Sequence, residues 1–503
     1  MGLREAGYEA IIVNNNPETV STDWSTADRL YFEPLTFEDV MHVIERERPL
    51  GVVAQFGGQT AINLAGPLAA AGVRILGTSA AGMDMAEDRE RFDALLGRLG
   101  IPRPAGGSAK SLEEAAAVAS RVGYPVLVRP SYVLGGRAME ICHSSEDLEE
   151  YVRTAVRVTP AHPILVDRYV GGREVEVDAV SDGQAVLIAG ILEHVERAGV
   201  HSGDSIAVYP PRSLSPEAKA RIEAYTLEMA RGLGVRGLMN VQYVLDDGTS
   251  GAPAGVHVLE VNPRSSRTVP FLTKVTGLGL VRVAVGVLLG RSLAEQGFPG
   301  PVHRVPEPPY AAVKMPVFSW AKLRGVDTAL GPEMKSTGEV MGIGATYADA
   351  LAKGFAACGV GLPAPGAAVL AMIADRDKAE ALPLLLEAHR LGLRLVATTG
   401  TARLLREAGA DVEVVRKIEE GQPNCLDAIR AGGVDFVVNT LTRGRRAERD
   451  GFRVRRAAAE MGLSCLTSLD TFAALLQALE VARRRSGTAP EAWALQEYGG
   501  IRP

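Results

Sequence analysis

Short apolar runs alternate with amphipathic segments along the first 85 residues, which is the pattern of an α/β domain. The expected strands span residues 8–13, 51–54 and 73–76, and the expected helices span residues 37–46 and 61–71. Strands that alternate with helices predict a parallel sheet that helices cover on both faces. Such a unit normally opens on a strand, whereas this sequence opens inside an expected helix at 3–6. We therefore expect the first strand of the domain to be missing.

A second region, residues 86–300, mixes longer helices with strands of alternating character. The expected helices are 89–99, 112–121 and 216–233, and the expected strands are 125–128, 164–170, 174–180, 237–245 and 256–261. In the segment 174–180, Glu174, Glu176 and Asp178 fall on one face and valines on the other, which predicts a half-buried strand. The strands 237–245 and 256–261 are joined by a segment rich in glycine and polar residues, so they predict a hairpin with a long loop.

The last third of the chain divides at about residue 366. Residues 301–366 are rich in proline and glycine and are expected to form a connecting region. A compact α/β unit is expected from there to about residue 485. Its predicted strands are 369–373, 394–397 and 436–439, and its predicted helices are 378–391, 402–408 and 471–484.

Length and composition set the broad class. A chain of 503 residues is too long for one core, and 47% hydrophobic with 23% charged residues is typical of a globular protein. The net charge of −6 gives no reason to expect a nucleic acid or an anionic membrane as partner.

The positions of the cysteines and the character of the N-terminal residues indicate where in the cell the protein is expected. The cysteines, Cys142, Cys358, Cys425 and Cys465, form no CxxC pair, and the N-terminus lacks the features of a signal peptide. We therefore expect a reducing, cytoplasmic location. The uncharged stretch 354–374 contains prolines and glycines, so we expect a linker followed by a buried strand rather than a membrane span.

The predicted hairpin carries the strongest chemical signal. Glu260 and Asn262 are two apart on one strand and share a face, and Gln242 on the partner strand can meet them. One carboxylate and two amide carbonyls are hard oxygen ligands of the kind that Mg²⁺ accepts beside nucleotide phosphates. Arg264 and Arg267 follow and could hold an anion or a transferring phosphoryl group. The alternative is a solvated polar face at a sheet edge.

Two loops give weaker signals. Gly135 and Gly136 follow a strand and could let backbone N–H groups approach a phosphate, although most Gly-Gly pairs are turns. The segment 193–204 is dense in polar groups, but His194 and His201 lack zinc-site spacing, and a surface loop is the alternative. No GxxxxGK[ST] sequence is present, which excludes a P-loop NTPase.

Several motifs, in this order, resemble the second synthetase half of the carbamoyl phosphate synthase large subunit. They are Asn16-Pro-Glu-Thr-Val-Ser-Thr-Asp23, Gln55-Phe-Gly-Gly-Gln-Thr60, Glu87-Asp-Arg-Glu-Arg-Phe92, Arg129-Pro-Ser-Tyr-Val-Leu-Gly-Gly-Arg-Ala-Met139, Val200-His-Ser-Gly-Asp204, Gly237-Leu-Met-Asn-Val-Gln242, Glu260-Val-Asn-Pro-Arg264 and Gly331-Pro-Glu-Met-Lys-Ser-Thr-Gly-Glu-Val340. The resemblance implies α/β and α+β domains: a truncated pre-ATP-grasp domain (1–85), an ATP-grasp domain (86–300), a connecting region (301–360) and a methylglyoxal-synthase-like allosteric domain (361–503).

The resemblance also implies roles for individual residues. Arg89 and Arg129 match phosphate contacts, Asp167 and Glu174 match adenine and ribose contacts, and His201 and Ser202 lie in a loop that lines ATP. Gln242, Glu260 and Asn262 match ligands of Mg²⁺ or Mn²⁺, and Arg264 and Arg267 match the anion clamp. Positions that bind a nucleotide monophosphate effector in some members are matched by Lys378, Thr398, Thr401, Lys417, Asn439 and Thr440. For these last residues, helix capping is the alternative.

The activity that the resemblance implies is the phosphorylation of carbamate by ATP to give carbamoyl phosphate, for pyrimidine and arginine biosynthesis. The family's N-terminal synthetase half and glutaminase small subunit are the expected partners, because neither is recognisable in this sequence. Another ATP-grasp ligase, such as a biotin carboxylase or an amino-acid ligase, is the alternative enzyme. An inactive regulatory or assembly module is the non-enzymatic alternative.

Overall fold

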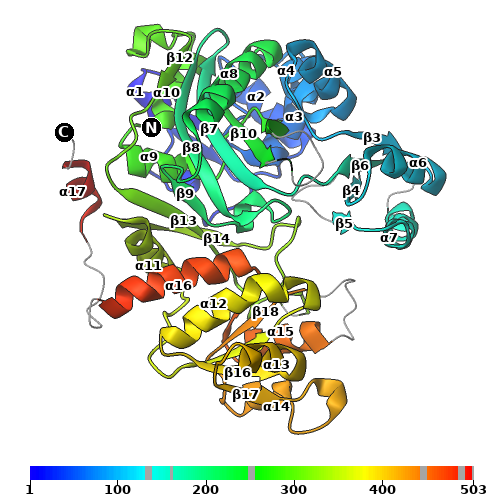
Figure 1. Ribbon diagram of the computed structural model, residues 1–503. Coiled ribbons are helices and arrows are strands. Elements are labelled where there is room, and N and C mark those ends of the chain that lie inside the picture. The colour runs from blue at the N-terminus through cyan, green and yellow to red at the C-terminus, as the bar shows by residue number, and fades with distance from the viewer. Residues whose placement is uncertain are drawn as a thin grey trace. The chain divides into compact units, whose positions relative to one another are not determined.

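The computed structural model describes residues 1–130, 139–158, 163–246, 248, 255–323, 325–441, 450–484 and 493–500 (Figure 1). The chain forms two compact units. Unit 1 comprises Met1–Pro104, Glu174–Leu192 and Pro210–Pro308, and unit 2 comprises Ala105–Arg173, Glu193–Tyr209 and Pro309–Pro503.

The helices and strands of unit 1 are short at its N-terminal end and long around its main sheet. Its helices are α1 (Gly2–Glu5), α2 (Phe37–Glu47), α3 (Gly58–Ala70), α4 (Ala80–Glu87), α5 (Arg89–Leu99), α8 (Pro216–Leu233), α9 (Thr268–Thr276) and α10 (Leu280–Leu288). Its strands are β1 (Ile11–Val13), β2 (Arg29–Tyr31), most of β7 (Arg173–Asp182), the first part of β8 (Val186–Arg197), β10 (Arg236–Asp246), β11 (Gly255–Asn262) and β12 (Val302–Arg304).

The N-terminal α/β region has the predicted helices but much less strand than predicted. Strand β1 pairs in parallel with β2 over three residues, and the predicted strands 51–54 and 73–76 form only an isolated bridge between Val52 and Ile75. In the described part of the chain, β1 is paired along one edge only. A strand with one partner makes few ladder hydrogen bonds, so the predicted strand 8–13 shortens to Ile11–Val13.

The main sheet of unit 1 has the strand order β11-β10-β7-β8, with β12 added in parallel to β8. Helices α5 and α8 pack on it through an apolar core that includes Leu96, Ile222 and Met239. The prediction of a half-buried strand at 174–180 was wrong. Glu174, Glu176 and Asp178 are 7%, 4% and 0% exposed, as buried as the valines on the other face. Alternation identified the two faces, but it could not show that polar partners cover the acidic one.

Unit 2 carries the remaining elements. Its strands are β3 (Gly106–Ala109), β4 (Val126–Pro130), β5 (Glu140–Cys142), β6 (Ile164–Arg168), β9 (Ala207–Tyr209), β13 (Ala311–Val317), β14 (Gly338–Gly344), β15 (Ala368–Met372), β16 (Arg394–Thr398), β17 (Val412–Val415), β18 (Phe436–Asn439) and β19 (Ser464–Leu466). Its helices are α6 (Leu112–Val122), α7 (Ser145–Val158), α11 (Tyr347–Ala357), α12 (Lys378–Arg390), α13 (Thr399–Glu407), α14 (Cys425–Arg430), α15 (Asp450–Glu460), α16 (Leu469–Arg484) and α17 (Leu495–Gly500).

Unit 2 contains a small antiparallel sheet and an ordered connecting region. The small sheet has the order β3-β6-β4-β5 and packs against α6 and α7. The residues expected to form the connecting region carry secondary structure that was not predicted, because β13 and β14 form an antiparallel pair, β9 joins β13, and α11 covers them. Gly342 permits this packing, since a Cβ there would lie 2.1 Å from the Ala350 carbonyl oxygen of α11.

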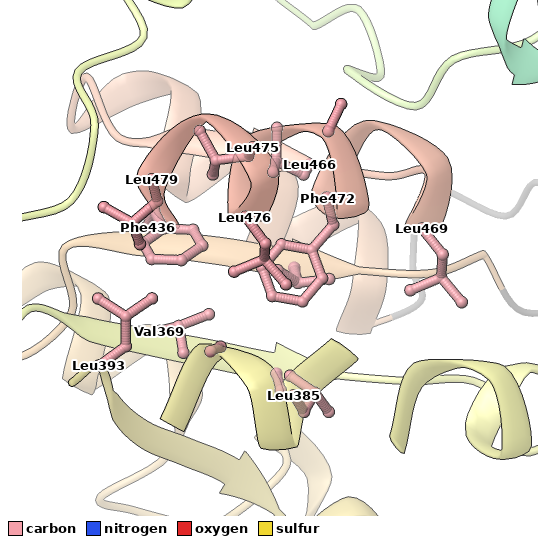
Figure 2. Close-up of a cluster of buried hydrophobic side chains, with 14 of the residues drawn as sticks. Val369, Leu385, Leu393, Phe436, Leu466, Leu469, Phe472, Leu475, Leu476 and Leu479 are labelled. Atoms are coloured by element: carbon pink, nitrogen blue, oxygen red, sulfur yellow. The ribbon is translucent and has the colours of Figure 1, made fainter. Parts of the chain in front are cut away.

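The C-terminal part of unit 2 is a five-stranded parallel sheet in the order β17-β16-β15-β18-β19. Helices α12, α13 and α16 contribute to the core on one face, and α14 and α15 to the core on the other. Figure 2 shows Phe472, Leu476 and Leu479 of α16 directed toward the layer that holds Val369 and Phe436. The order of a doubly wound sheet brings the carboxyl ends of β15, β16 and β18 to one edge, where such folds bind ligands.

Within the described residues, no single helix is long and apolar enough to span a membrane. The bent pair α9 and α10 passes that test together, by length and composition only.

Candidate active site

The hairpin of β10 and β11 brings the predicted metal ligands onto one face. Gln242 lies directly opposite Glu260, and Asn240 lies opposite Asn262. Opposed residues of an antiparallel pair point to the same side, so all four side chains share that face. Gln242, Glu260 and Asn262 are half-buried, whereas Asn240 is buried. A bulge after Gln242 changes the register for the rest of the hairpin.

The chemistry of this face fits a hard divalent cation. Glu260 supplies a carboxylate, and Gln242 and Asn262 supply amide oxygens, which suit Mg²⁺. Asn262 Nδ2 donates to Glu260 Oε1 at 2.9 Å, so the Asn262 amide would rotate to place its oxygen beside the carboxylate in a shared cation site. Among the described residues, no cluster of three or more His, Cys, Asp or Glu side chains offers another metal site.

The two predicted clamp residues follow the hairpin on a turn that leads into α9. Arg264 is half-buried, and its Nη2 donates to Asn262 Oδ1 at 3.3 Å. Arg267 is exposed and stands at the N-cap position of α9. Two guanidinium groups on one turn, next to a carboxylate that can hold a cation, can bind an anion that also contacts the cation.

A buried polar network under the turn was not predicted. Asn240 Nδ2 donates to Glu176 Oε1 at 2.8 Å and to Asp178 Oδ1 at 3.1 Å. Burial raises the pKa of Asp178 to about 7, and the neighbouring Glu176 carboxylate adds to the rise. The signal in the sequence was the acidic face of the strand 174–180, which was assigned to a half-buried surface.

The other predicted nucleotide contacts are divided between the units. In unit 1, Arg89 begins α5 and bonds Asp93, and Glu174 is buried in β7. In unit 2, Arg129 and Asp167 lie on the neighbouring strands β4 and β6. A Cβ at Gly106 would lie 1.9 Å from Asp167 Oδ1, so the glycine leaves room for this carboxylate. Gly135 and Gly136 lie outside the described residues.

The loop that carries His201 and Ser202 is fastened inside unit 2. His201 Nδ1 accepts a hydrogen bond from Gly203 N at 3.0 Å, which leaves Nε2 to carry the proton of the neutral ring. Both carboxylate oxygens of Asp204 accept from backbone amides, Lys335 N at 2.8 Å and Ser336 N at 2.9 Å. The buried Lys314 donates to Ser202 O at 3.0 Å. The motif 331–340 therefore supports this loop.

Most of the predicted effector residues gather at the carboxyl edge of the parallel sheet. Thr398 ends β16 and stands at the N-cap position of α13 without a side-chain capping bond, Asn439 ends β18, and Thr440 Oγ1 accepts from Ala374 N at 2.8 Å. Lys378 pairs with Asp375 at 2.6 Å. Thr398, Asn439 and Thr440 are buried, as expected of side chains that line an enclosed ligand site or the core itself.

Two further basic residues, Lys417 and Arg403, influence the charge of Asp375 beside Lys378. The pKa of Asp375 is lowered, first by its bond to Lys378 and then by the charges of Lys417 and Arg403. The charges of Lys378, Lys417 and Arg403 therefore all act on Asp375, and these three residues are called the positive region; Arg403, which also pairs with Glu407 at 3.9 Å, was not predicted. Thr401 is 1% exposed, and its hydroxyl has no partner among the described residues. A buried hydroxyl without a partner is costly, which suits a site completed by a ligand.

Comparisons with known proteins assign three segments of the chain. Residues 1–85 match the carbamoyl phosphate synthase preATP-grasp domain, residues 88–296 match the ATP-binding domain of the carbamoyl-phosphate synthase L chain, and residues 380–467 match the MGS-like domain. The site hairpin lies within the second segment. Thr401, Arg403 and Lys417 lie within the third segment, and Lys378 lies just before it.

Solved structures with a similar fold include biotin carboxylases. The biotin carboxylase domain of Hydrogenobacter thermophilus 2-oxoglutarate carboxylase, solved with MgADP, ADP and bicarbonate, is 17% identical, has a TM-score of 0.56 and is matched over 70% of this chain and 84% of that one. Campylobacter jejuni biotin carboxylase, solved as a β-γ-ATP complex, is 16% identical, with a TM-score of 0.56 and coverage of 70% and 85%. At this identity the likeness shows the fold. The chain thus joins a pre-ATP-grasp domain, an ATP-grasp domain of the carbamoyl-phosphate synthase L chain type and an MGS-like domain.

Proposed function

We propose that this chain transfers the γ-phosphoryl group of ATP to carbamate, giving carbamoyl phosphate and ADP. A carbamate oxygen attacks the γ-phosphorus, the bond from phosphorus to the β,γ-bridging oxygen breaks, and ADP leaves with that electron pair. Such a transfer needs positioning and charge neutralisation more than covalent help from the protein. The residues of the site are of that kind.

The observation that carries the proposal is the hairpin and its turn. Gln242 and Glu260 face each other at the start of a segment that ends in Arg264 and Arg267, inside the stretch that matches the carbamoyl-phosphate synthase ATP-binding domain. Glu260, Gln242 and Asn262 would hold Mg²⁺ or Mn²⁺, which would neutralise charge on the nucleotide phosphates. The two arginines would bind the anionic carbamate and the phosphoryl group.

Carbamate would have to come from a partner. The chain's own thiols are poor nucleophiles, because burial raises the pKa of Cys142 and Cys465 to about 12 and that of Cys425 to about 11. A glutaminase uses a thiolate, so we propose that a separate glutaminase and an N-terminal synthetase half supply ammonia and carbamate.

The direct test runs the reaction backwards, with ADP, Mg²⁺ and carbamoyl phosphate as reactants and ATP as the measured product. ATP formation that depends on carbamoyl phosphate is the expected result. The fold of the biotin carboxylases favours bicarbonate-dependent ATPase activity as the second candidate. ATP hydrolysis stimulated by bicarbonate, without ATP formation from carbamoyl phosphate, would favour that candidate and contradict the proposal.

We further propose that a nucleotide monophosphate binds the MGS-like domain as an effector. The support is the positive region of Lys378, Lys417 and Arg403 beside the unpartnered hydroxyl of Thr401. Three cations and the N-terminus of α13 are complementary to a phosphate.

A further inference from the structure

The turn that carries Arg264 and Arg267 lies between the end of β11 at Asn262 and the start of α9 at Thr268. Neither a strand ladder nor a helix fixes its backbone. The direction of the two guanidinium groups therefore depends on what holds the turn from below.

The first anchor of the turn is Gln55, from the motif 55–60. Gln55 is fully buried, and its Nε2 donates to Pro263 O at 3.0 Å and to Thr78 Oγ1 at 2.8 Å. Its backbone oxygen accepts from Ser265 N at 3.0 Å. The two bonds to the turn flank Arg264 on either side. Gly237 leaves the room for this side chain, since a Cβ there would lie 2.2 Å from Gln55 Oε1.

The second anchor is the buried acidic pair, which holds the residues on either side of Arg267. Ser266 Oγ donates to Asp178 Oδ1 at 2.7 Å. Thr268 Oγ1 lies in hydrogen-bonding contact with Asp178 Oδ2 and, at 3.0 Å, with Glu176 Oε1. The turn is thus fastened at both arginines by side chains that come from distant parts of unit 1.

Stability alone does not account for this pair. Two adjacent carboxyl groups at 4% and 0% exposure cost desolvation and mutual repulsion, and an apolar pair of similar volume often gives equal or greater stability. A costly buried network is understandable where it fixes the geometry of a functional group within a fraction of an ångström.

We infer that Gln55 and Asp178 are positioning residues for anion binding, which act by holding the turn that presents Arg264 and Arg267. This inference rests on the proposed function, because that function assigns the anion to the two arginines. Neither Gln55 nor Asp178 needs to touch the anion. Their removal should loosen the turn, so that binding of the anion has to order it first and becomes weaker.

The test measures binding of inorganic phosphate to the full chain by calorimetry, which requires no turnover. Asp178→Ala should weaken phosphate binding roughly tenfold, the effect of losing hydrogen bonds of about this strength to a charged group. Asp178→Asn, which retains acceptor and donor atoms, should restore most of the affinity. Ser266→Ala, a milder change that removes one bond to Asp178, should weaken binding several-fold. Arg267→Ala should weaken it most.

Asp182→Asn is the matched control. Asp182 lies on the same strand as Asp178, but its carboxylate accepts from the amides of Gln184, Ala185 and Leu293, away from the turn. This variant should lose stability and keep wild-type phosphate affinity. Equal affinity in wild type, Asp178→Ala and Ser266→Ala would overturn the inference. So would equal weakening in Asp182→Asn, or a wild-type chain that binds no phosphate.

The reverse reaction separates the inference from the proposed function. Asp178→Ala should raise KM for carbamoyl phosphate with less effect on kcat, whereas a partly unfolded population would lower kcat at unchanged KM. Absence of ATP formation in the wild type, together with the expected change in phosphate affinity, would contradict the carbamate assignment and leave the positioning role standing.

Discussion

At the scale of single residues, the buried acidic pair of Glu176 and Asp178 makes the free energy of unfolding depend on pH. Burial beside Glu176 raises the pKa of Asp178 from its ordinary value of 3.8 to about 7. Between these values the folded chain holds a proton that the unfolded chain has released. The contribution of Asp178 to the free energy of unfolding therefore falls as the pH rises from about 4 to about 7, by at most about 1.4 kcal/mol per pH unit.

Asp178→Asn should remove this slope, because its side chain is neutral at every pH. The midpoint of thermal unfolding of the wild type should fall relative to that of the variant as the pH is raised from about 5 to about 8. Titrating groups outside the acidic pair, such as the buried Glu196, are common to both proteins and cancel in the difference. A constant difference across this range would show that Asp178 titrates at its ordinary value.

Glu260 supplies the carboxylate of the proposed cation site, and its charge should matter more than its shape. Glu260→Gln keeps the size and an oxygen but removes the negative charge, so phosphoryl transfer should fall roughly 10²–10³-fold. Formation of ATP from ADP and carbamoyl phosphate measures the loss. Glu295→Gln serves as control, since the Glu295 carboxylate caps a turn by accepting from Ser292 N at 2.7 Å and from Ser292 Oγ at 2.8 Å. A rate for Glu260→Gln close to that of the control would contradict the cation site.

The sequence predicted the hairpin face, because strand spacing alone places Glu260 and Asn262 together and the pairing register adds Gln242. It did not predict the network below, because the partners of Asp178 come from β10 and from the turn. Contacts between segments that are far apart along the chain leave no periodic signal. Arg403 was missed for the same reason, since only the fold brings it near Asp375.

At the scale of elements, the helices that were predicted have nearly the observed bounds, whereas others, such as α7 and α9, and the strands of the connecting region were not predicted. Capped, periodic helices such as α5 and α8 have the expected bounds, with Asp88 and Ser215 as their caps. Strands β13 and β14 contain proline and glycines, which lowered their apparent strand propensity. Gly342 and Gly344 are required by close packing against α11 rather than by flexibility.

Gly342→Ala tests this explanation. A Cβ at position 342 would lie 2.1 Å from Ala350 O and 2.6 Å from Gly354 N, both backbone atoms, so α11 would have to move away from β14. The variant should lose about 1–3 kcal/mol of stability, as overpacked cores do, and its thermal midpoint should fall. Gly361→Ala, where a Cβ would meet nothing within 4 Å, is the control and should unfold like the wild type. Equal midpoints for the two variants would refute close packing as the reason for this glycine.

At the scale of the whole molecule, three segments match known domains. Residues 1–85 and 88–296 match two domains of carbamoyl-phosphate synthase, and residues 380–467 match the MGS-like domain. The four-part division of the chain stays a prediction. Inside unit 2, the proposed effector edge and the His201 loop are linked by contacts through one segment. Asp327 pairs with Arg455, which also donates to Asn439 Oδ1 at 2.6 Å, and Gly331 O accepts from His201 N at 2.9 Å.

The last prediction concerns the effector. A uridine or purine nucleoside monophosphate should bind the full chain, measured by calorimetry, and Thr401→Val should weaken that binding several-fold, because the valine cannot supply the buried hydroxyl. Thr226→Val is the control, since the Thr226 hydroxyl is equally buried but bonds Tyr243 in unit 1. If the contacts through residues 327–331 couple the two places, the monophosphate should also change the apparent affinity for MgATP, and MgATP should change the affinity for the monophosphate by the same factor. If the monophosphate binds but the affinity for MgATP does not change, the MGS-like domain binds the nucleotide without regulating the binding of MgATP. Equal binding by wild type and Thr401→Val would place the effector elsewhere.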